Sequence, residues 1–418
     1  MLLISDFGFR IMNYKIIIAV LVMAMMPCHV MGQGVTRAEL AQKKVDKNGN
    51  FRYWTQDSPA LARLKDFVAR VTDPSSKDFV AVKDRIATFD VDGTLVCETA
   101  PFYMNWILCF HRYLHDASYV PDEEERKLMA EYEEYVLKNH ASTDEMGDVV
   151  QFLQAKSFRG MTQREFSDYI GNFLDTVSPM GLSNLTWGTA IYWPMIEAVS
   201  YLVANDFKVY ICSGVDRDVC RVLTKDIFDI PAYQMMTSDV NYVMESQAAN
   251  GEWTERLNAE SYQYKVGEEI VRGDMKQLCT AINKIVIMRR ELGQKPILSW
   301  GNSSGDFPMF HYTNLDNPLP HISFCLICDD TKREFGNPGK AEKCRLACEE
   351  YGWVPVSMSN EWTTIYGPGV EVVSPTVVTA PGAPEGMSTK HNIKGQGIST
   401  PMHHGVYIEN GVKKMRSY

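Results

Sequence analysis

The sequence has no excess of positive charge. Its 418 residues contain 42 Lys and Arg against 52 Asp and Glu, a formal net charge of −10. Nucleic-acid-binding surfaces need clustered Lys and Arg, and the aromatic residues here are not interleaved with basic ones in any groove-like pattern. We therefore expect no nucleic-acid partner.

The chain also lacks an apolar run at its amino terminus long enough to cross a membrane. Ile16–Met26 holds only eleven residues, whereas a spanning helix needs about 20. The run follows Lys15 and precedes a small-residue region near Gly32, which is the pattern of a secretory signal. We predict a signal peptide at residues 1–32 and a secreted or periplasmic protein without a membrane span. Lipid attachment at Cys28 is an alternative, but the residues before it make a poor lipobox.

Cysteine spacing gives little support for a structural zinc site. Of ten cysteines, Cys28 lies in the predicted signal, and the remaining odd number leaves at least one free thiol. Cys325, Cys328, Cys344 and Cys348 imitate zinc-ligand spacing. However, the first two lie three residues apart in an apolar strand, so their side chains point to opposite faces. We expect buried core cysteines or a disulfide instead.

The most informative segment is residues 86–95, IATFDVDGTL. A strand-like run ends there in two carboxylates, Asp90 and Asp92, which share one face of an extended chain. Gly93 permits a tight turn, and Thr94 adds a hydroxyl beside it. Two carboxylates on a rigid backbone suit Mg²⁺, which in turn suits a phosphate.

Three further strand-like runs also end at polar clusters, and helical patterns separate them. The runs are 207–212, 296–300 and 322–328, and the clusters are Ser213-Gly214, Gly301–Asp306 and Asp329-Asp330. Strands alternating with helices, such as 194–204 and 217–226, predict an α/β fold with a doubly wound parallel sheet. Ligands bind outside the carboxyl ends of such strands, where the polar clusters would gather.

With these motifs in order, the chain resembles the haloacid dehalogenase superfamily, in its phosphatase branch, over roughly residues 80–360. FDVDGTL matches the first motif, which implies that Asp90 is the nucleophile and Asp92 the acid/base. ICSG matches the second motif. The resemblance places Ser213, with Gly214, in the phosphate-binding position, and we add Thr94 to the phosphate-binding set.

The third and fourth motifs lie further along the chain. Lys284, in NKIVIMRRELGQKPI, best matches the third, as a phosphate-binding cation. GNSSGD matches the fourth, with Asn302 and Asp306 at the spacing of metal-binding acids. The resemblance therefore implies an Mg²⁺ site formed by Asp90, Asp92, Asn302 and Asp306.

The predicted chemistry also follows from the residue types. A carboxylate that attacks phosphorus forms an acyl phosphate, and so splits hydrolysis into two easier steps. Asp92 can protonate the leaving oxygen and later deprotonate water. Ser213, Thr94, Lys284 and Mg²⁺ would spread the charge of the transition state. Displacement of halide needs no proton, so Asp92 favours phosphate chemistry.

Asn302 departs from the commonest fourth motif, which has Asp at this position. An amide oxygen still binds Mg²⁺, more weakly, and some secreted or nonspecific phosphatases of the superfamily carry a similar GNS form. We read this as a tuned catalytic site. The alternative from another class is a noncatalytic, exported protein that binds a phosphorylated ligand.

The domain organisation follows from composition and helical patterns. We predict a helical extension at 33–80, a core at 81–97 and 190–365, a helical cap at 98–189, and a linker and tail at 366–418 with a short hairpin strand at 406–408. The aromatic helix at 102–113 should form cap core, with one or two positions reaching the substrate as the alternative. A small β insertion within 232–275 should contain short strands at 240–244 and 262–266 around a hairpin at Asn250-Gly251. Asp122 and the capping box Thr162–Glu165 open two cap helices. The pattern does not predict the oligomeric state.

The helical cap resembles that of phosphoserine phosphatase and its relatives, which implies a small phosphomonoester substrate of the phosphoserine type. Phosphorylcholine, or a broad range as in acid phosphatases, is the alternative. Glu98 lies eight residues after Asp90. In that family, the acid that contacts the substrate ammonium stands one residue later. It is a candidate for that contact, or else a solvated or hinge residue.

Overall fold

The computed structural model describes residues 34–99, 102–256 and 266–373, and three strands at 390–392, 405–409 and 412–416. The chain divides into two units, Met1–Gly34 and Val35–Tyr418, and the account below concerns the second. The predicted signal at 1–32 lies outside the described residues. In the described part, no helix has both the length and the apolar character that a membrane span requires.

A seven-stranded sheet forms the centre of the fold, with strand order β4-β3-β2-β1-β5-β6-β7. All neighbouring pairs are parallel except β3 and β4. The bounds are β1 Ile86–Phe89, β2 Lys208–Asp216, β3 Met235–Met244, β4 Ile270–Gln277, β5 Leu298–Gly301, β6 Ile322–Ile327 and β7 Val354–Ser357. The predicted α/β class and the four predicted core strands are confirmed.

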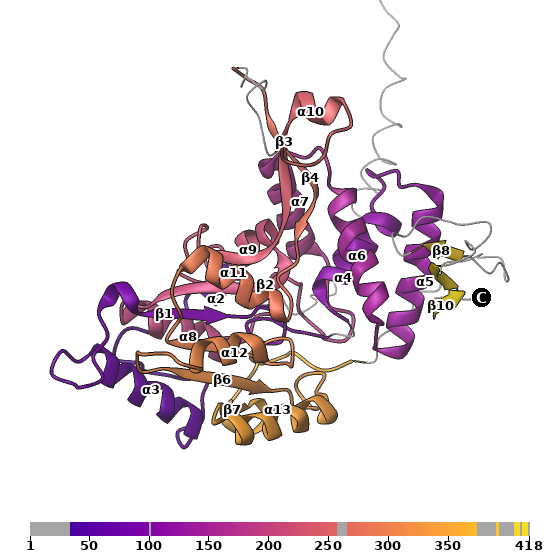
Figure 1. The fold of residues 1–418 in the computed structure, drawn as a ribbon. Helices are drawn as coiled ribbons and strands as arrows, with labels where there is room; N and C mark the ends of the chain where they lie inside the picture. Colours follow the sequence, from indigo (N-terminus) through magenta and orange to yellow (C-terminus); the bar gives the residue numbers. More distant parts are fainter. Residues whose placement is uncertain are drawn as a thin grey trace, which may run out of the picture. The chain divides into compact units, whose positions relative to one another are not determined.

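Helices cover both faces of the sheet (Figure 1). Successive side chains of a strand point to opposite faces, so each face packs with its own helices into a separate apolar cluster. In β6, Phe324 and Leu326 belong to the cluster that includes side chains of α3, α8 and α9, and Cys325 and Ile327 belong to the cluster of α11, α12 and α13. These helices span Pro59–Thr72, Trp193–Ala204, Arg217–Thr224, Ile282–Leu292, Phe307–Asn314 and Pro338–Tyr351 respectively. The sheet is therefore doubly wound, as predicted.

The segment before the core is helical in part, as predicted, but it is integrated into the core. It holds α2 (Arg37–Ala41), α3 and a 3₁₀ turn at Val82–Asp84. The apolar stripe of α3 is buried in the main cluster. Glu361, in α14 (Met358–Glu361), accepts hydrogen bonds from Ser58 Oγ at 2.6 Å and Ala60 N at 2.9 Å, and so caps α3 from the other end of the chain.

The insertion between β1 and β2 is helical, and we call residues 98–189 the cap. It contains α4 (Met104–Phe110), a π-helical turn (His111–His115), α5 (Glu123–Asn139), α6 (Asp144–Ser157) and α7 (Gln163–Thr176). Asp122 caps α5, and the capping box of Thr162 and Glu165 opens α7, as predicted. Figure 1 shows α4, α5 and α6 together beyond the end of the sheet at which β1 leads into them.

The predicted β insertion is an antiparallel ribbon of β3 and β4 at the edge of the sheet. Val240–Met244 is the outer half of β3, as predicted. The partner strand is 270–277, not 262–266, of which residues 262–265 lie outside the described residues. Asn250-Gly251 does not form the two-residue hairpin turn that we expected, because the short helix α10 (Glu245–Ala249) precedes it and continues the chain away from β3.

The segment after residue 366 is only partly the linker that we predicted. Residues 371–373 pair with the cap, where Ser183 N donates to Glu371 O and Val373 N to Gly181 O, both at 2.9 Å. Further on, β8 (Lys390–Asn392), β9 (Gly405–Glu409) and β10 (Val412–Arg416) form a separate antiparallel sheet. The predicted terminal hairpin strand at 406–408 is thus confirmed.

The cysteines of the described residues are all unpaired and buried. Cys212 Sγ and Cys279 Sγ lie 3.9 Å apart, which is too far for a disulfide bond. Within the described residues, no group of three or more His, Cys, Asp or Glu side chains is placed to hold a metal ion. The buried positions of these cysteines agree with our expectation of core cysteines.

Candidate active site

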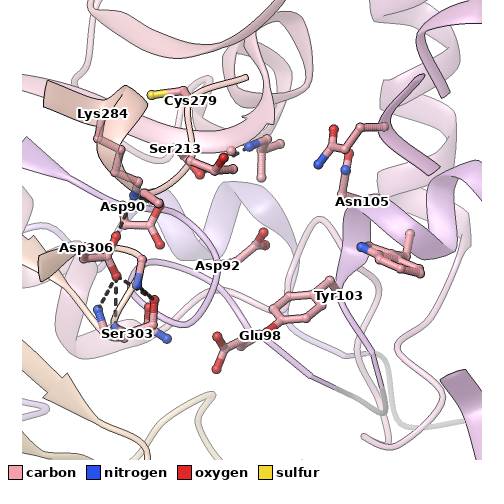
Figure 2. Close-up of a pocket in the computed structure, with 18 residues that line it drawn as sticks. Asp90, Asp92, Glu98, Tyr103, Asn105, Ser213, Cys279, Lys284, Ser303 and Asp306 are labelled. Atoms are coloured by element: carbon pink, nitrogen blue, oxygen red, sulfur yellow. Dashed lines mark hydrogen bonds and ion pairs between the residues drawn. The ribbon is translucent and has the colours of Figure 1, made fainter. Parts of the chain in front are cut away.

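Three neighbouring strands bring the predicted site residues together at their carboxyl ends. Phe89 in β1 is in register with Ile211 in β2 and Trp300 in β5, so the residues that follow these strands meet at one level. A cavity of about 240 Å³ opens there. Its lining contains eight of the predicted site residues, Asp90, Asp92, Glu98, Ser213, Gly214, Lys284, Asn302 and Asp306 (Figure 2).

The turn after β1 needs glycine at position 93 for two reasons. Gly93 has a φ of +70°, a region that side-chain-bearing residues rarely adopt. A Cβ at this position would also lie 1.8 Å from Asn302 Nδ2. The turn that carries Asp92 and the loop that carries Asn302 can approach each other only because residue 93 has no side chain.

Lys284, from α11, lies between Asp90, the candidate nucleophile, and Asp306 of the fourth motif. Its Nζ donates to Asp90 Oδ1 at 2.8 Å and to Asp306 Oδ1 at 2.6 Å. Burial alone would lower the pKa of Lys284, but the two carboxylates outweigh it and raise the pKa well above its ordinary value. Burial, with the charge of Asp306, raises the pKa of Asp90 to about 6, against the opposing effect of Lys284.

Asp306 has a different surrounding from the one expected of a metal ligand. Its Oδ1 accepts from Lys284, while its Oδ2 accepts from Asn302 N at 2.9 Å and Ser303 N at 3.0 Å. A Cβ on Gly301 would lie 2.5 Å from the Asp306 side chain, so glycine there makes this fold-back possible. Both oxygens are thus used to hold Lys284 and the 302–303 loop, and its predicted role as a direct metal ligand has no support in this geometry.

The remaining predicted ligands fit a magnesium ion. Asp92 Oδ1, Asn302 Oδ1 and Asn302 Nδ2 are buried and have no hydrogen-bond partner. Buried polar atoms without partners are costly, and a hard cation bound by carboxylate and amide oxygens would satisfy the two oxygens. Burial, and then the neighbouring charges of Asp90 and Glu98, raise the pKa of Asp92 well above its usual value. Asp90, Asp92 and Asn302 are the residues that would hold Mg²⁺.

The part of the cavity next to Asp90 and Lys284 also offers groups for a phosphate (Figure 2). Ser213 and Gly214, at the bend in β2, line the cavity together with Thr280 and Ala281 at the start of α11. Ala281 has a φ of +46°, a strained conformation for a residue with a side chain. Thr94 is fully buried and is not among the lining residues. Its predicted phosphate-binding role is therefore not supported by its position.

The cap supplies four further lining residues. Two are aromatic residues of the helix that we predicted at 102–113, and two, Asn105 and Gln151, were not singled out by the sequence pattern. Tyr103 and Trp106 come from the start of α4 and pack edge-on against Phe102, each with 5.0 Å between ring centroids. Asn105 and Gln151 lie on the same wall. In Figure 2, Asn105 and Tyr103 stand on the other side of Asp92 from the pair Asp90 and Lys284.

Glu98 is neither solvated nor free. Lys340, near the start of α13, donates to both of its carboxylate oxygens. Burial would lower the pKa of Lys340, but Glu98 raises it above its usual value. The sequence reasoning missed Lys340, because nothing in the PGKAEK stretch distinguishes it from a surface lysine.

A second buried carboxyl lies next to Cys97, where the chain leaves the core for the cap. Glu334 accepts hydrogen bonds from Tyr366 Oη, from Phe335 N at 2.8 Å and from Cys97 Sγ at 3.7 Å. Burial is the main cause that raises its pKa to about 7. Glu334 does not line the cavity.

Comparisons with known proteins find only distant likenesses. No protein-family model matches the chain, and no curated protein matches it. Among solved structures, a functionally unknown protein from Anaerococcus prevotii DSM 20548 is 13% identical, with 73% of this chain and 92% of that one covered and a TM-score of 0.43.

Two further solved structures are named for phosphatase activities. Cytosolic 5'-nucleotidase IIIB bound to cytidine is 10% identical, over 74% of this chain and 90% of that one, with a TM-score of 0.40. A phosphoserine phosphohydrolase-like protein from Francisella tularensis subsp. tularensis SCHU S4 is 12% identical, over 58% and 87%, with a TM-score of 0.31. Likenesses this distant assign neither a family nor an activity.

Proposed function

We propose that the protein is a haloacid dehalogenase-type phosphatase that hydrolyses small phosphomonoesters with Mg²⁺. The observation that carries the proposal is the cluster at the end of β1, where Lys284 bridges Asp90 and Asp306 within hydrogen-bond distance. Asp92 and Asn302 complete the same cavity with unpartnered polar atoms. The order of the four motifs along the chain supports the superfamily.

In the proposed reaction, Asp90 attacks phosphorus, so that a bond forms between its carboxylate oxygen and phosphorus while the bond to the leaving oxygen breaks. Asp92 gives a proton from its other carboxyl oxygen, the one that would not bind the metal, to that leaving oxygen. Water then attacks phosphorus, Asp92 takes the proton, and the bond to Asp90 breaks to release phosphate. Asp90, Asp92 and Asn302 would hold Mg²⁺, which would supply neutralisation of the negative charge of the phosphoryl group.

Lys284 has two functions in this scheme. Its ammonium keeps one oxygen of Asp90 oriented, and its charge stabilises the transferring phosphoryl group. Asp306 holds the ammonium in place and also fixes the Asn302 backbone, so it acts as a positioning residue. Ser213 lines the cavity and supplies a hydroxyl for a phosphoryl oxygen.

Turnover of p-nitrophenyl phosphate, with added Mg²⁺ and with EDTA, tests the proposal. We expect Mg²⁺-dependent release of p-nitrophenol that Asp90→Asn lowers by several orders of magnitude, with an unchanged circular dichroism spectrum. Absence of turnover by the wild-type protein, together with measurable phosphate binding, would favour the noncatalytic ligand-binding alternative.

The helical cap and Glu98 were the two reasons to expect phosphoserine-like substrates. The cap is present, but both carboxylate oxygens of Glu98 already accept hydrogen bonds from Lys340. Phosphorylcholine and a broad substrate range are the alternatives, and a panel of phosphomonoesters assayed with the purified protein distinguishes the three.

We also propose that the protein is exported. Support comes from the Lys15–Gly32 pattern alone. The proposal predicts a mature amino terminus between about residues 28 and 36, which intact-mass measurement of the native protein tests. Soluble cytosolic protein with residues 12–27 intact would contradict it.

A further inference from the structure

Asn105, in the cap, has a side chain whose hydrogen-bonding capacity is not used within the protein. The residue is only 4% exposed, it lines the cavity, and its Oδ1 has no hydrogen-bond partner. A buried amide oxygen without a partner is destabilising, because it has lost its hydrogen bonds to water without replacement. Because the oxygen belongs to the wall of the cavity that faces away from the phosphate side, a ligand group is the natural partner.

The lining carboxylates outside the proposed metal site are already paired. Both oxygens of Glu98 accept from Lys340, and Asp306 accepts from Lys284. Among the described lining residues, no carboxylate outside the proposed metal site is left to receive an ammonium group. An ammonium group that pairs with Glu98 would have to displace Lys340 from its buried ion pair, which is costly.

We propose that Asn105 determines specificity by hydrogen-bonding a hydroxyl of an uncharged leaving group, so that the preferred substrates are polyol or sugar phosphates. This deepens the proposed function and rests on it for the position of the phosphate. An amide presents one acceptor and two donors, which matches a hydroxyl-bearing group. The same amide gains nothing from a quaternary ammonium, which has no hydrogen to donate.

The size and shape of the cavity agree with such a group. Its volume of about 240 Å³ is below the range of about 300–1,000 Å³ that drug-sized ligands occupy. Tyr103 and Trp106 line the same wall as Asn105, and both rings pack against Phe102. Aromatic rings and an amide on one wall suit a small polyol, whose C–H faces pack on the rings while a hydroxyl reaches Asn105.

The test measures binding, so that it is separate from turnover. In the Asp90→Asn background, calorimetry with Mg²⁺ compares glycerol 3-phosphate and a hexose 6-phosphate with phosphoserine and phosphorylcholine. We expect the neutral ligands to bind at least about tenfold more tightly. Asn105→Leu, which keeps the side-chain size, should reduce affinity for them about tenfold or more, the effect of one lost hydrogen bond to a buried group.

Two further variants complete the design. Val120→Ala, at a cap position 89% exposed, controls for changes in the cap and should not alter affinity. Lys340→Met frees Glu98 and should shift preference towards phosphorylcholine, which gives a readout if Asn105→Leu fails to fold.

The outcomes separate the two proposals. Tighter binding of phosphoserine or phosphorylcholine by the parent protein, or an equal loss for all ligands in Asn105→Leu, would overturn the role of Asn105 while leaving phosphatase activity intact. Selective binding of the neutral phosphates without any turnover would instead remove the proposed catalysis and keep the specificity.

Discussion

Replacing Gly93 with alanine tests the geometry that joins the first and fourth motifs. The substitution introduces a Cβ at a φ of +70°, where the backbone of a non-glycine residue costs about 1–2 kcal/mol. It also places that Cβ 1.8 Å from Asn302 Nδ2, so the amide must move. Forcing extra atoms into a packed site costs about 1–3 kcal/mol more, so we expect unfolding to become easier by roughly 2–5 kcal/mol in total.

Gly352→Ala provides the matched control. Gly352 has a φ of +72° at the end of α13, and its added Cβ would meet nothing within 4 Å. We therefore expect only the backbone cost, about 1–2 kcal/mol, and unchanged activity. The difference between the two variants isolates the contact with Asn302.

The assay combines urea denaturation with Mg²⁺ titration of p-nitrophenyl phosphate hydrolysis. Gly93→Ala should need a higher Mg²⁺ concentration for half-maximal activity, because a displaced Asn302 is a poorer ligand, whereas Gly352→Ala should not. If both variants lose the same stability and keep the wild-type metal dependence, the proximity of Gly93 to Asn302 has no functional meaning and the proposed metal site is misplaced.

Three other changes have defined outcomes. Asp92→Asn should nearly abolish hydrolysis of alkyl phosphates and reduce that of p-nitrophenyl phosphate less, because p-nitrophenolate hardly needs a proton; equal losses would argue against Asp92 as the acid. Arg272→Met breaks the buried ion pairs of Arg272 with Asp216 and Asp218, and should lower the free energy of unfolding in urea by roughly 3–5 kcal/mol. As a control, Arg126→Ala removes an ion pair at the surface and should lower the free energy of unfolding by less than about 1 kcal/mol. The pKa of Glu334 is raised to about 7 in the folded protein, so folding favours the protonated carboxyl. This stabilisation is fully present at pH values below the pKa of Glu334 in the unfolded chain, and it is lost as the pH rises through about 7. Glu334→Gln should therefore melt with less pH dependence than the wild type between about pH 5 and pH 8, and parallel melting curves would refute the shift.

Much of the core could be predicted because its signals are local. The apolar runs that end in Asp90, Ser213 and Asn302 are continuous in sequence, and parallel strands bring their carboxyl ends to one edge. The capping residues Asp122 and Thr162 also act within their own helix turn, and both predictions are confirmed.

The rest of the structure depends on tertiary packing, which no local pattern encodes. The partner strand of β3 was placed too early, because the pairing joins Met244 to Ile270 across the short helix α10 and a segment outside the described residues. Asp306 has the spacing of a metal ligand, but its orientation depends on Lys284 from another helix. Lys340 lies 242 residues from Glu98, so no local pattern could pair them.

The sequence predicted the helices of the cap, but it did not predict all of their residues that line the cavity. An aromatic, amphipathic helix near residues 102–113 was expected to form cap core, and most of its side chains are buried. Which of its positions would face the cavity depends on how α4 packs against α6, and this places Asn105 and Gln151 on the same wall.

Direct detection of the phosphorylated nucleophile tests the central claim. Asp92→Asn protein, which should hydrolyse the intermediate slowly, is mixed with p-nitrophenyl phosphate and Mg²⁺, quenched in acid and analysed by peptide mass spectrometry. The account predicts one phosphoryl group on the peptide that contains Asp90, and none when Asp90→Asn is added to the same protein. A phosphoryl group on any other residue, or turnover by the doubly substituted protein, would contradict it.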